Sequence, residues 1–438
     1  MVKWILLIYI LKKMIVLMAN NKVKAQPFDC MQYFYTAAQE PLIRCFVQFN
    51  GHLNENALKR AVDLSIGAIP LIACCFDEKS HCWRKHGFTA DSIVHLIEAR
   101  SDDGAAAKKT LLSSIDRKCG PQLKIFIVRG EKSDALCIII NHMVSDGGGF
   151  KEYLYLLAGL YSKCEKDERY HIKPEPFGKR NLNQLLRNLT FTQKLGILFS
   201  KAQFHKPDPA MILPIKGDPS NPTLVIRRIE KEPFARIRSF AKSSRASVND
   251  MLLAAYIRAL HRATGCADIT IPCPVDLRKY KKTGQTCGTC NLTSNYFCHV
   301  DMTFDEPFGD TLKKVSTQMR AQKESDACLK GPMLFHMMFH LLPFGMVRKL
   351  FYKISPVPVT SYTNLGIIDD EKFCFGNLAV EDVFISTAVK KAPYFQLSVS
   401  TYRGRCTLTS SFYGTKEDRN TVETFLNQVE NEMNSLFI

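Results

Sequence analysis

The chain has 438 residues and carries 59 lysine and arginine residues against 42 aspartate and glutamate residues, giving a formal net charge of +17. Hydrophobic residues make up 46% and charged residues 23%, a balance that excludes a disordered or fibrous protein. The chain is longer than the length at which a single hydrophobic core usually stops growing, so we expect two lobes.

The first nineteen residues are strongly apolar, but Lys12 and Lys13 interrupt them. Neither apolar piece reaches the roughly 18 to 20 residues that cross a bilayer. Three interpretations fit this segment. In the first, the natural start is Met18 and the upstream piece is an artefact. In the second, the segment is a weak membrane-surface anchor, and in the third it is a signal peptide in which Lys3 precedes the apolar run. We favour the first and place residues 1–24 outside the fold.

Alternating apolar strands and amphipathic helices follow, and they predict a mixed α/β architecture. In the first half we expect strands over residues 42–49, 123–129 and 135–141 and helices over 150–163 and 182–204. A proline-rich run over 206–222 then predicts a linker, which makes residues 25–205 the N-terminal lobe.

The second half, residues 223–438, is expected to form the C-terminal lobe. Predicted strands cover residues 223–229, 269–272, 378–386, 394–401 and 406–412. Predicted helices cover residues 233–244, 248–264, 307–329 and 333–351, with a terminal helix from Lys416.

The segment CIIINHMVSDGGGF, residues 137–150, is the strongest candidate for chemistry. It places His142 directly after an apolar strand, Asp146 four residues later, and then a run of glycines. An imidazole is the side chain best suited to moving a proton near neutral pH, so His142 is a candidate general base. The alternative is a structural histidine followed by a tight glycine connection.

Two later segments accompany this motif. ITIPCPVDLRKY, residues 269–280, is a strand that leads to Arg278, and VTSYTNLGIID, residues 359–369, contains Ser361 and Asn364. Together with residues 25–62, these segments resemble the chloramphenicol acetyltransferase-like superfamily, which includes condensation domains, plant acyltransferases and alcohol acetyltransferases. That family carries an HHxxxDG motif, whose first histidine is Asn141 in this chain. The resemblance covers about residue 25 to the end.

The resemblance implies two chloramphenicol acetyltransferase-like α/β lobes, with the active site in a channel between them. It implies that His142 acts as the general base and that Asp146 pairs with Arg278 to hold the loop. Asp146 is therefore assigned a structural role, and Gly147 is expected to permit a sharp turn.

The resemblance does not determine which side chains contact the oxyanion or the acceptor. Asn364 or Ser361 could donate a hydrogen bond to the oxyanion or contact the acceptor, and the alternative is a purely structural turn beside Gly366.

The expected reaction is transfer of an acyl group from a thioester to a hydroxyl or amine, without a metal or a bound cofactor. The thioester would be acyl-CoA or an acyl carrier protein, and the positive charge suits either CoA phosphates or an acidic carrier surface. Two alternatives remain, namely a condensation-type enzyme acting with a carrier protein in trans and a non-catalytic thioester-binding protein. The acceptor is expected to be a small molecule, and no nucleic-acid-binding motif is present.

The sixteen cysteines indicate either disulfides or metal binding, and one histidine pair has the spacing of zinc ligands. Many of the cysteines lie in apolar segments, which predicts free thiols and a cytoplasmic protein. CGTC, residues 287–290, and HMMFH, residues 336–340, have metal-ligand spacing but lack a second pair or a third ligand. We therefore predict no metal site, and membrane association only if the N-terminal extension is native.

Overall fold

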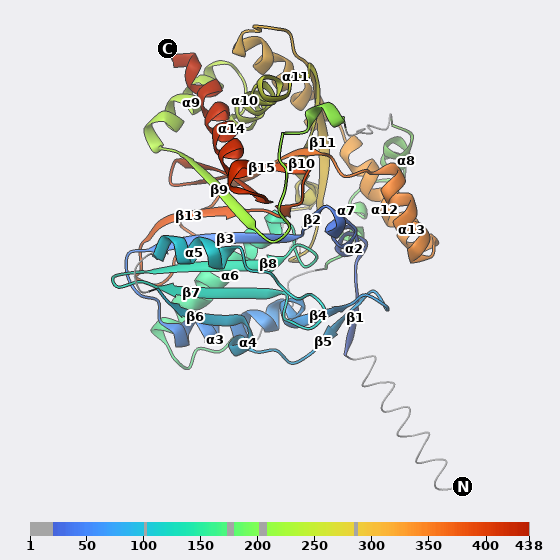
Figure 1. The fold of residues 1–438 in the computed structure, drawn as a ribbon. Helices are drawn as coiled ribbons and strands as arrows, with labels where there is room; N and C mark the ends of the chain where they lie inside the picture. The colour runs from blue at the N-terminus through green and yellow to red at the C-terminus, as the bar shows by residue number, and fades with distance from the viewer. Residues whose placement is uncertain (1–20, 100–102, 173–178, 201–207, 284–287, 438) are drawn as a thin grey trace, which may run out of the picture.

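The computed structural model describes residues 21–99, 103–172, 179–200, 208–283 and 288–437. The interpretations of residues 1–20 and of Cys287 lie outside these residues. Residues 22–24 of the expected extension belong to the fold, because they form strand β1 (Lys22–Lys24), which pairs with β5 (Cys82–Lys85). The described chain forms a mixed α/β structure with two lobes, drawn one above the other in Figure 1. The predicted fold class is confirmed.

The N-terminal lobe is built on a five-stranded sheet in the order β13-β3-β8-β7-β6. Its strands are β3 (Leu42–Phe49), β6 (Val94–Glu98), β7 (Leu123–Arg129), β8 (Asp134–Asn141) and β13 (Val380–Ser386). Its helices are α3 (Glu55–Ala68), α4 (Ala90–Ile93), α5 (Asp103–Leu111) and α6 (Gly147–Lys166).

The central strand β8 is buried along its whole length because helices cover both faces of this sheet. Ile138 and Ile140 join the main core, whereas Ala135 and Cys137 pack in a smaller cluster with Leu111 of α5. This alternation follows from the two-residue period of a strand, and it leaves the end of β8 as the rigid base of the motif loop.

The C-terminal lobe contains a six-stranded sheet in the order β12-β15-β16-β14-β2, with β9 also paired to β16. Its strands are β2 (Gln39–Glu40), β9 (Pro222–Ile229), β12 (Thr360–Ile367), β14 (Val389–Lys390), β15 (Phe395–Tyr402) and β16 (Arg405–Tyr413). A separate antiparallel pair joins β10 (Asp268–Asp276) to β11 (Thr293–Asp301). The helices of this lobe are α9 (Lys231–Ser243), α10 (Val248–Thr264), α11 (Phe308–Glu324) and α14 (Lys416–Asn434).

The two sheets exchange strands, so they depart from the predicted division of the chain into residues 25–205 and 223–438. β13 comes from the C-terminal half and pairs with β3, while β2 comes from the N-terminal half and pairs with β14. The described part of the predicted linker is also packed, because Asp418 accepts hydrogen bonds from the backbone N–H groups of Lys216 and Gly217.

Three helices stand together at one side of the molecule, at the right of Figure 1. They are α8 (Phe191–Phe199), α12 (Lys330–Leu341) and α13 (Phe344–Ile354), and the short α7 (Asn183–Leu186) precedes them. The helices predicted over residues 182–204 and 333–351 are therefore each broken. Thr190 caps a new helix within the first, and Pro343 ends the second because proline cannot continue a helix.

The remaining elements are β1 (Lys22–Lys24), α2 (Pro27–Phe34), β4 (Cys74–Asp77) and β5 (Cys82–Lys85). Among the described residues, every helix is too short or too polar to span a bilayer.

Candidate active site

His142 lies on the loop that leaves β8, at the junction of the two lobes. Its backbone N–H donates to the carbonyl oxygen of Pro41 at 2.8 Å. The preceding Asn141 is buried, donates its amide to Gln122 Oε1 at 2.8 Å and accepts from the backbone N–H of Met143 at 3.0 Å. The side chain at this departure from the HHxxxDG pattern thus braces the loop.

Asn291 fixes the ring of His142. The Nδ2 of Asn291 donates to the carbonyl oxygens of His142 at 2.9 Å and Met143 at 3.1 Å. Those oxygens can only accept, so the amide orientation is settled and Asn291 Oδ1 faces His142 Nδ1 at 3.1 Å as an acceptor. Nδ1 must therefore carry the proton, and Nε2 keeps the free lone pair that a base needs.

The surroundings of His142 also favour its neutral form. Burial lowers the pKa of His142 below its ordinary value, and the hydrogen bond with Asn291 and the charge of Asp146 only partly oppose this. At neutral pH the imidazole is therefore neutral and able to accept a proton.

Asp146 and Arg278 form a buried ion pair at the start of α6. Arg278 Nη1 lies 3.0 Å from Asp146 Oδ1, and Asp146 is only 1% exposed. The carboxylate also caps α6 by accepting from Gly149 N at 2.8 Å, and it accepts from Leu292 N, just before β11, at 2.6 Å. Although burial raises the pKa of Asp146, Arg278 and these hydrogen bonds outweigh it and hold the pKa below its usual value.

The predicted pairing of Asp146 with Arg278 is thus present in the structure. Both oxygens of the carboxylate are engaged by Arg278, the start of α6 and the 290–293 segment. The pair fastens the motif loop of one lobe to β10 and β11 of the other.

The three glycines permit close packing rather than a turn. Gly147 is the first residue of α6 and has no left-handed backbone conformation, which differs from the sharp turn that we predicted. A Cβ there would lie 2.4 Å from Leu365 Cδ2. A Cβ at Gly148 would lie 2.9 Å from Arg278 Nη1, and one at Gly149 would lie 3.0 Å from Arg278 Nη2. The glycine run therefore admits the C-terminal lobe against the motif.

Ser361 and Asn364 both lie on β12, whose Leu365 abuts Gly147. Ser361 Oγ donates to the carbonyl oxygen of Phe395 at 3.2 Å. Asn364 Nδ2 donates to Asn249 Oδ1 at 3.0 Å, and its Oδ1 accepts from Gly366 N at 2.8 Å. These bonds lie within the C-terminal lobe, and a contact of either side chain with substrate stays a prediction.

Lys390 is a charged group near His142 that the sequence did not single out. It is buried on β14, and its Nζ donates to Gln39 Oε1. Burial lowers the pKa of Lys390 to about 8, and its charge slightly lowers the pKa of His142. The pattern VKKAP offered no periodicity that distinguishes this buried lysine from the exposed Lys391 beside it.

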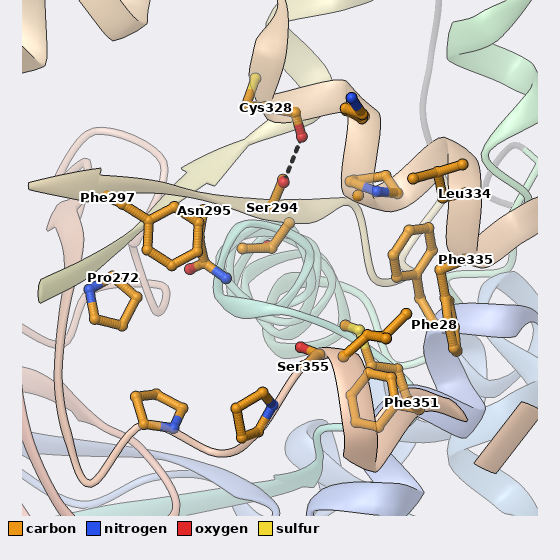
Figure 2. Close-up of a pocket in the computed structure, with 18 of the residues that line it drawn as sticks. Phe28, Pro272, Ser294, Asn295, Phe297, Cys328, Leu334, Phe335, Phe351 and Ser355 are labelled. Carbon is orange, nitrogen blue, oxygen red and sulfur yellow. Dashed lines mark hydrogen bonds between the residues drawn. The ribbon is translucent and has the colours of Figure 1, made fainter. Parts of the chain in front are cut away.

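An apolar cavity of about 240 Å³ lies next to this region. Figure 2 shows Phe28, Phe335 and Phe351 on one side of it and Pro272 and Phe297 on the other. Thr293 also lines the cavity, and its hydroxyl donates to Asp146 Oδ2 at 2.9 Å. The cavity thus reaches the residues that hold the motif loop, and its aromatic walls suit an apolar ligand.

Among the described side chains considered as metal ligands, Cys290 and His340 contact backbone carbonyl oxygens, whereas His336 Nδ1 is buried without a hydrogen-bond partner. Cys290 Sγ donates to the carbonyl oxygen of Gly288 at 3.1 Å, and His340 Nδ1 lies 2.7 Å from the carbonyl oxygen of His336. The cysteines that the structure describes are free thiols, as predicted, and most are buried. An exposed group of Asp268, His299 and Asp301 at the edge of β10 and β11 stands apart from the motif.

Comparison with known proteins identifies the family. The family model for the condensation domain matches residues 42–328. This chain belongs to the condensation-domain family. It is also 26% identical over 246 residues to a component of the linear gramicidin synthase of Brevibacillus parabrevis, and the match covers 53% of this chain but only 3% of that protein's length.

Solved structures share the fold of this condensation-domain protein at low sequence identity. Polyketide synthase associated protein 5 from Mycobacterium tuberculosis superposes with a TM-score of 0.65 at 15% identity, covering 92% of this chain and 97% of the other. A trichothecene 15-O-acetyltransferase from Fusarium sporotrichioides gives 0.67 at 12% identity, covering 94% and 95%. The first condensation domain of the calcium-dependent antibiotic synthetase gives 0.65 at 13%, covering 94% and 95%. The predicted superfamily is confirmed.

Proposed function

We propose that the protein is an acyltransferase that moves an acyl group from a thioester to a hydroxyl or amine acceptor, with His142 as the general base. The single observation that carries this proposal is the fixed tautomer of His142. Its Nδ1–H is directed to Asn291, and its Nε2 lone pair is left to accept a proton. A thioester is already activated, so one base and correct positioning suffice for this chemistry.

In the proposed step, Nε2 of His142 takes the proton of the acceptor as the acceptor's oxygen or nitrogen bonds to the thioester carbonyl carbon. The carbonyl electron pair moves to oxygen and forms a tetrahedral oxyanion. When the oxyanion collapses, the carbon–sulfur bond breaks and the leaving thiolate takes the proton from His142. The products are an ester or amide and a free thiol, and the base is neutral again.

The remaining residues would position these groups. Asp146 and Arg278 hold the loop, so that the base does not move as its charge changes. Ser361 and Asn364 are candidate donors to the oxyanion or the acceptor, because they share a strand with Leu365, which packs against the motif. We propose no metal and no resident cofactor for this chemistry.

Two donors fit this proposal. Acyl-CoA would make the protein a stand-alone acyltransferase, as the fold shared with a trichothecene 15-O-acetyltransferase suggests. An acyl carrier protein in trans would make it a condensation-type enzyme, which membership of the condensation-domain family supports. The net charge of +17 suits CoA phosphates and an acidic carrier surface equally, and we expect the reaction to take place in the cytoplasm.

The test is thiol release from acyl-CoA and from an acyl-loaded carrier protein, each with a panel of small alcohols and amines. We expect turnover with one donor and a loss of about 10²- to 10⁴-fold in His142→Ala. Full activity of His142→Ala would refute the base assignment. Tight thioester binding without turnover, in the native chain and in His142→Ala alike, would instead show that the protein is a non-catalytic thioester-binding protein.

A further inference from the structure

The helices α8, α12 and α13 present eight bulky apolar side chains to solvent, which we call the exposed helix face. Its members are Phe191, Leu195, Phe199, Leu334, Met337, Leu341, Met346 and Ile354. Phe199 is 84% exposed and Leu341 is 75% exposed. The three helices stand side by side in Figure 1, and Lys330 of α12 donates to the carbonyl oxygen of Ser200 at the end of α8.

The spacing of these side chains shows that α8 and α12 each contribute a stripe, and α13 adds Met346 and Ile354. On α8 the exposed residues recur every four positions, at 191, 195 and 199, and on α12 they follow at 334, 337 and 341. Residues three and four apart lie on the same face of a helix, so the apolar groups of α8 and of α12 are each gathered on one side of their helix. A large exposed apolar patch of this kind marks a surface that binds something.

The charge around the exposed helix face has a single sign. Residues 179–199 and 327–368 contain no aspartate or glutamate. The exposed or partly exposed cations on these helices are Lys194, Lys330, Arg348, Lys349 and Lys353, and none of them forms an ion pair with a described residue. A helical surface with bulky apolar groups and unpaired cations fits an anionic lipid interface.

The exposed helix face continues into the apolar cavity. Leu334 and Ile354 belong to the face and also line the cavity, together with the buried Phe335 and Phe351. Figure 2 shows Leu334, Phe335 and Phe351 on the same side of the cavity. The exposed helix face and the mainly apolar cavity therefore share residues.

We propose that the exposed helix face docks the protein on an anionic lipid surface. This goes beyond the proposed acyl transfer and is independent of His142. A lipid surface buries each apolar side chain without needing complementary pockets, and it neutralises several cations at once. The individual protrusions of Phe199 and Leu341 fit this better than they fit a protein partner, whose interface would need matching hollows.

The experiment is co-sedimentation of the full chain with two kinds of vesicle. One kind is phosphatidylcholine alone, and the other also contains about 30% phosphatidylglycerol, an anionic fraction that gives a strong surface potential. The apolar variant is Phe199→Ser with Leu341→Ser, and the charge variant is Arg348→Gln with Lys349→Gln. The matched control is Phe304→Ser, because Phe304 is 88% exposed but precedes α11, away from the exposed helix face. All of these chains retain residues 1–20, so any contribution of that segment is equal.

We expect binding to the anionic vesicles only, with a loss of about tenfold or more in the partition coefficient for each double variant and no change for Phe304→Ser. High salt should weaken the vesicle binding of the native chain and have less effect on that of the charge variant. Equal binding of all variants would overturn the proposal. Unchanged vesicle binding with a loss of activity on a loaded carrier protein would overturn it in favour of carrier docking.

Discussion

The ion pair between Asp146 and Arg278 gives a prediction that needs no knowledge of the substrate. The perturbations are Asp146→Asn, Arg278→Met and the two together. Asp146→Asn keeps an oxygen to cap Gly149, but it places an amide N–H group opposite the donors Leu292 N and Thr293 Oγ1. Arg278→Met leaves a buried carboxylate without its counter-charge.

The magnitude follows from the burial of the pair. Removing one member of a buried ion pair costs about 3 to 5 kcal/mol because the other charge is left uncompensated. The double variant removes both charges, so we expect its free energy of unfolding to fall by about the same amount rather than by the sum. The expected coupling energy is therefore about 3 kcal/mol. Asp276→Asn is the matched control, because Asp276 contacts the same arginine but is half exposed, and it should cost below about 1 kcal/mol.

The measurement is urea unfolding of the native chain, both single variants, the double variant and Asp276→Asn. Because the pKa of Asp146 is lowered in the folded state, the advantage of the native chain over Asp146→Asn is present above the unfolded pKa of about 3.9. It should shrink as the pH falls below that value through the folded pKa. Additive single effects, or an advantage that grows on acidification, would refute the role of this pair.

The other predictions concern the base and the glycine run. The rate should be level at neutral pH and fall as the pH drops through a pKa below 6.5, because protonation occupies the lone pair of His142; a rate that rises on acidification would contradict this. Asn291→Leu should lower the rate by about tenfold or more, because the ring of His142 is no longer held. It should also shift that midpoint to lower pH, because the hydrogen bond with Asn291 raises the pKa of His142 in the native chain. Gly147→Ala should cost about 1 to 3 kcal/mol of stability and be partly restored by Leu365→Ala, as thermal unfolding can measure. Gly159→Ala, in an open position of the same helix, should instead stabilise by about 0.5 to 1 kcal/mol.

Local elements were predictable where local chemistry determines them. The strands Leu42–Phe49 and Leu123–Arg129 and the helix Val248–Thr264 have the predicted bounds, because apolar periodicity and a Ser247 capping box define them. The helix after the motif begins at Gly147 instead of Phe150, since Asp146 caps it and glycine propensity is overridden by packing.

The exchange of strands between lobes was not predictable, since no local pattern tells β13 (Val380–Ser386) which sheet it will join.

The candidate site divides in the same way. His142 stood out because a histidine followed by a glycine run comes directly after an apolar strand. The pairing of Asp146 with Arg278 was expected only from the resemblance to the chloramphenicol acetyltransferase-like superfamily. Asn291 did not stand out, because no local sequence pattern marks this asparagine. Only the fold brings its Oδ1 to 3.1 Å from Nδ1 of His142. Buried Lys390 was missed for the related reason that burial depends on which strands surround β14.

The exchanged strands also govern how the protein can be made by the ribosome. β3 must wait for β13, and β2 must wait for β14, which emerge roughly 340 residues later, or about 20 to 70 s at ordinary rates of synthesis. During that interval β3 presents an unpaired apolar edge to other nascent chains. Such long-range pairing slows folding, so the N-terminal half made alone should aggregate, and slow synthesis should demand protection by a chaperone.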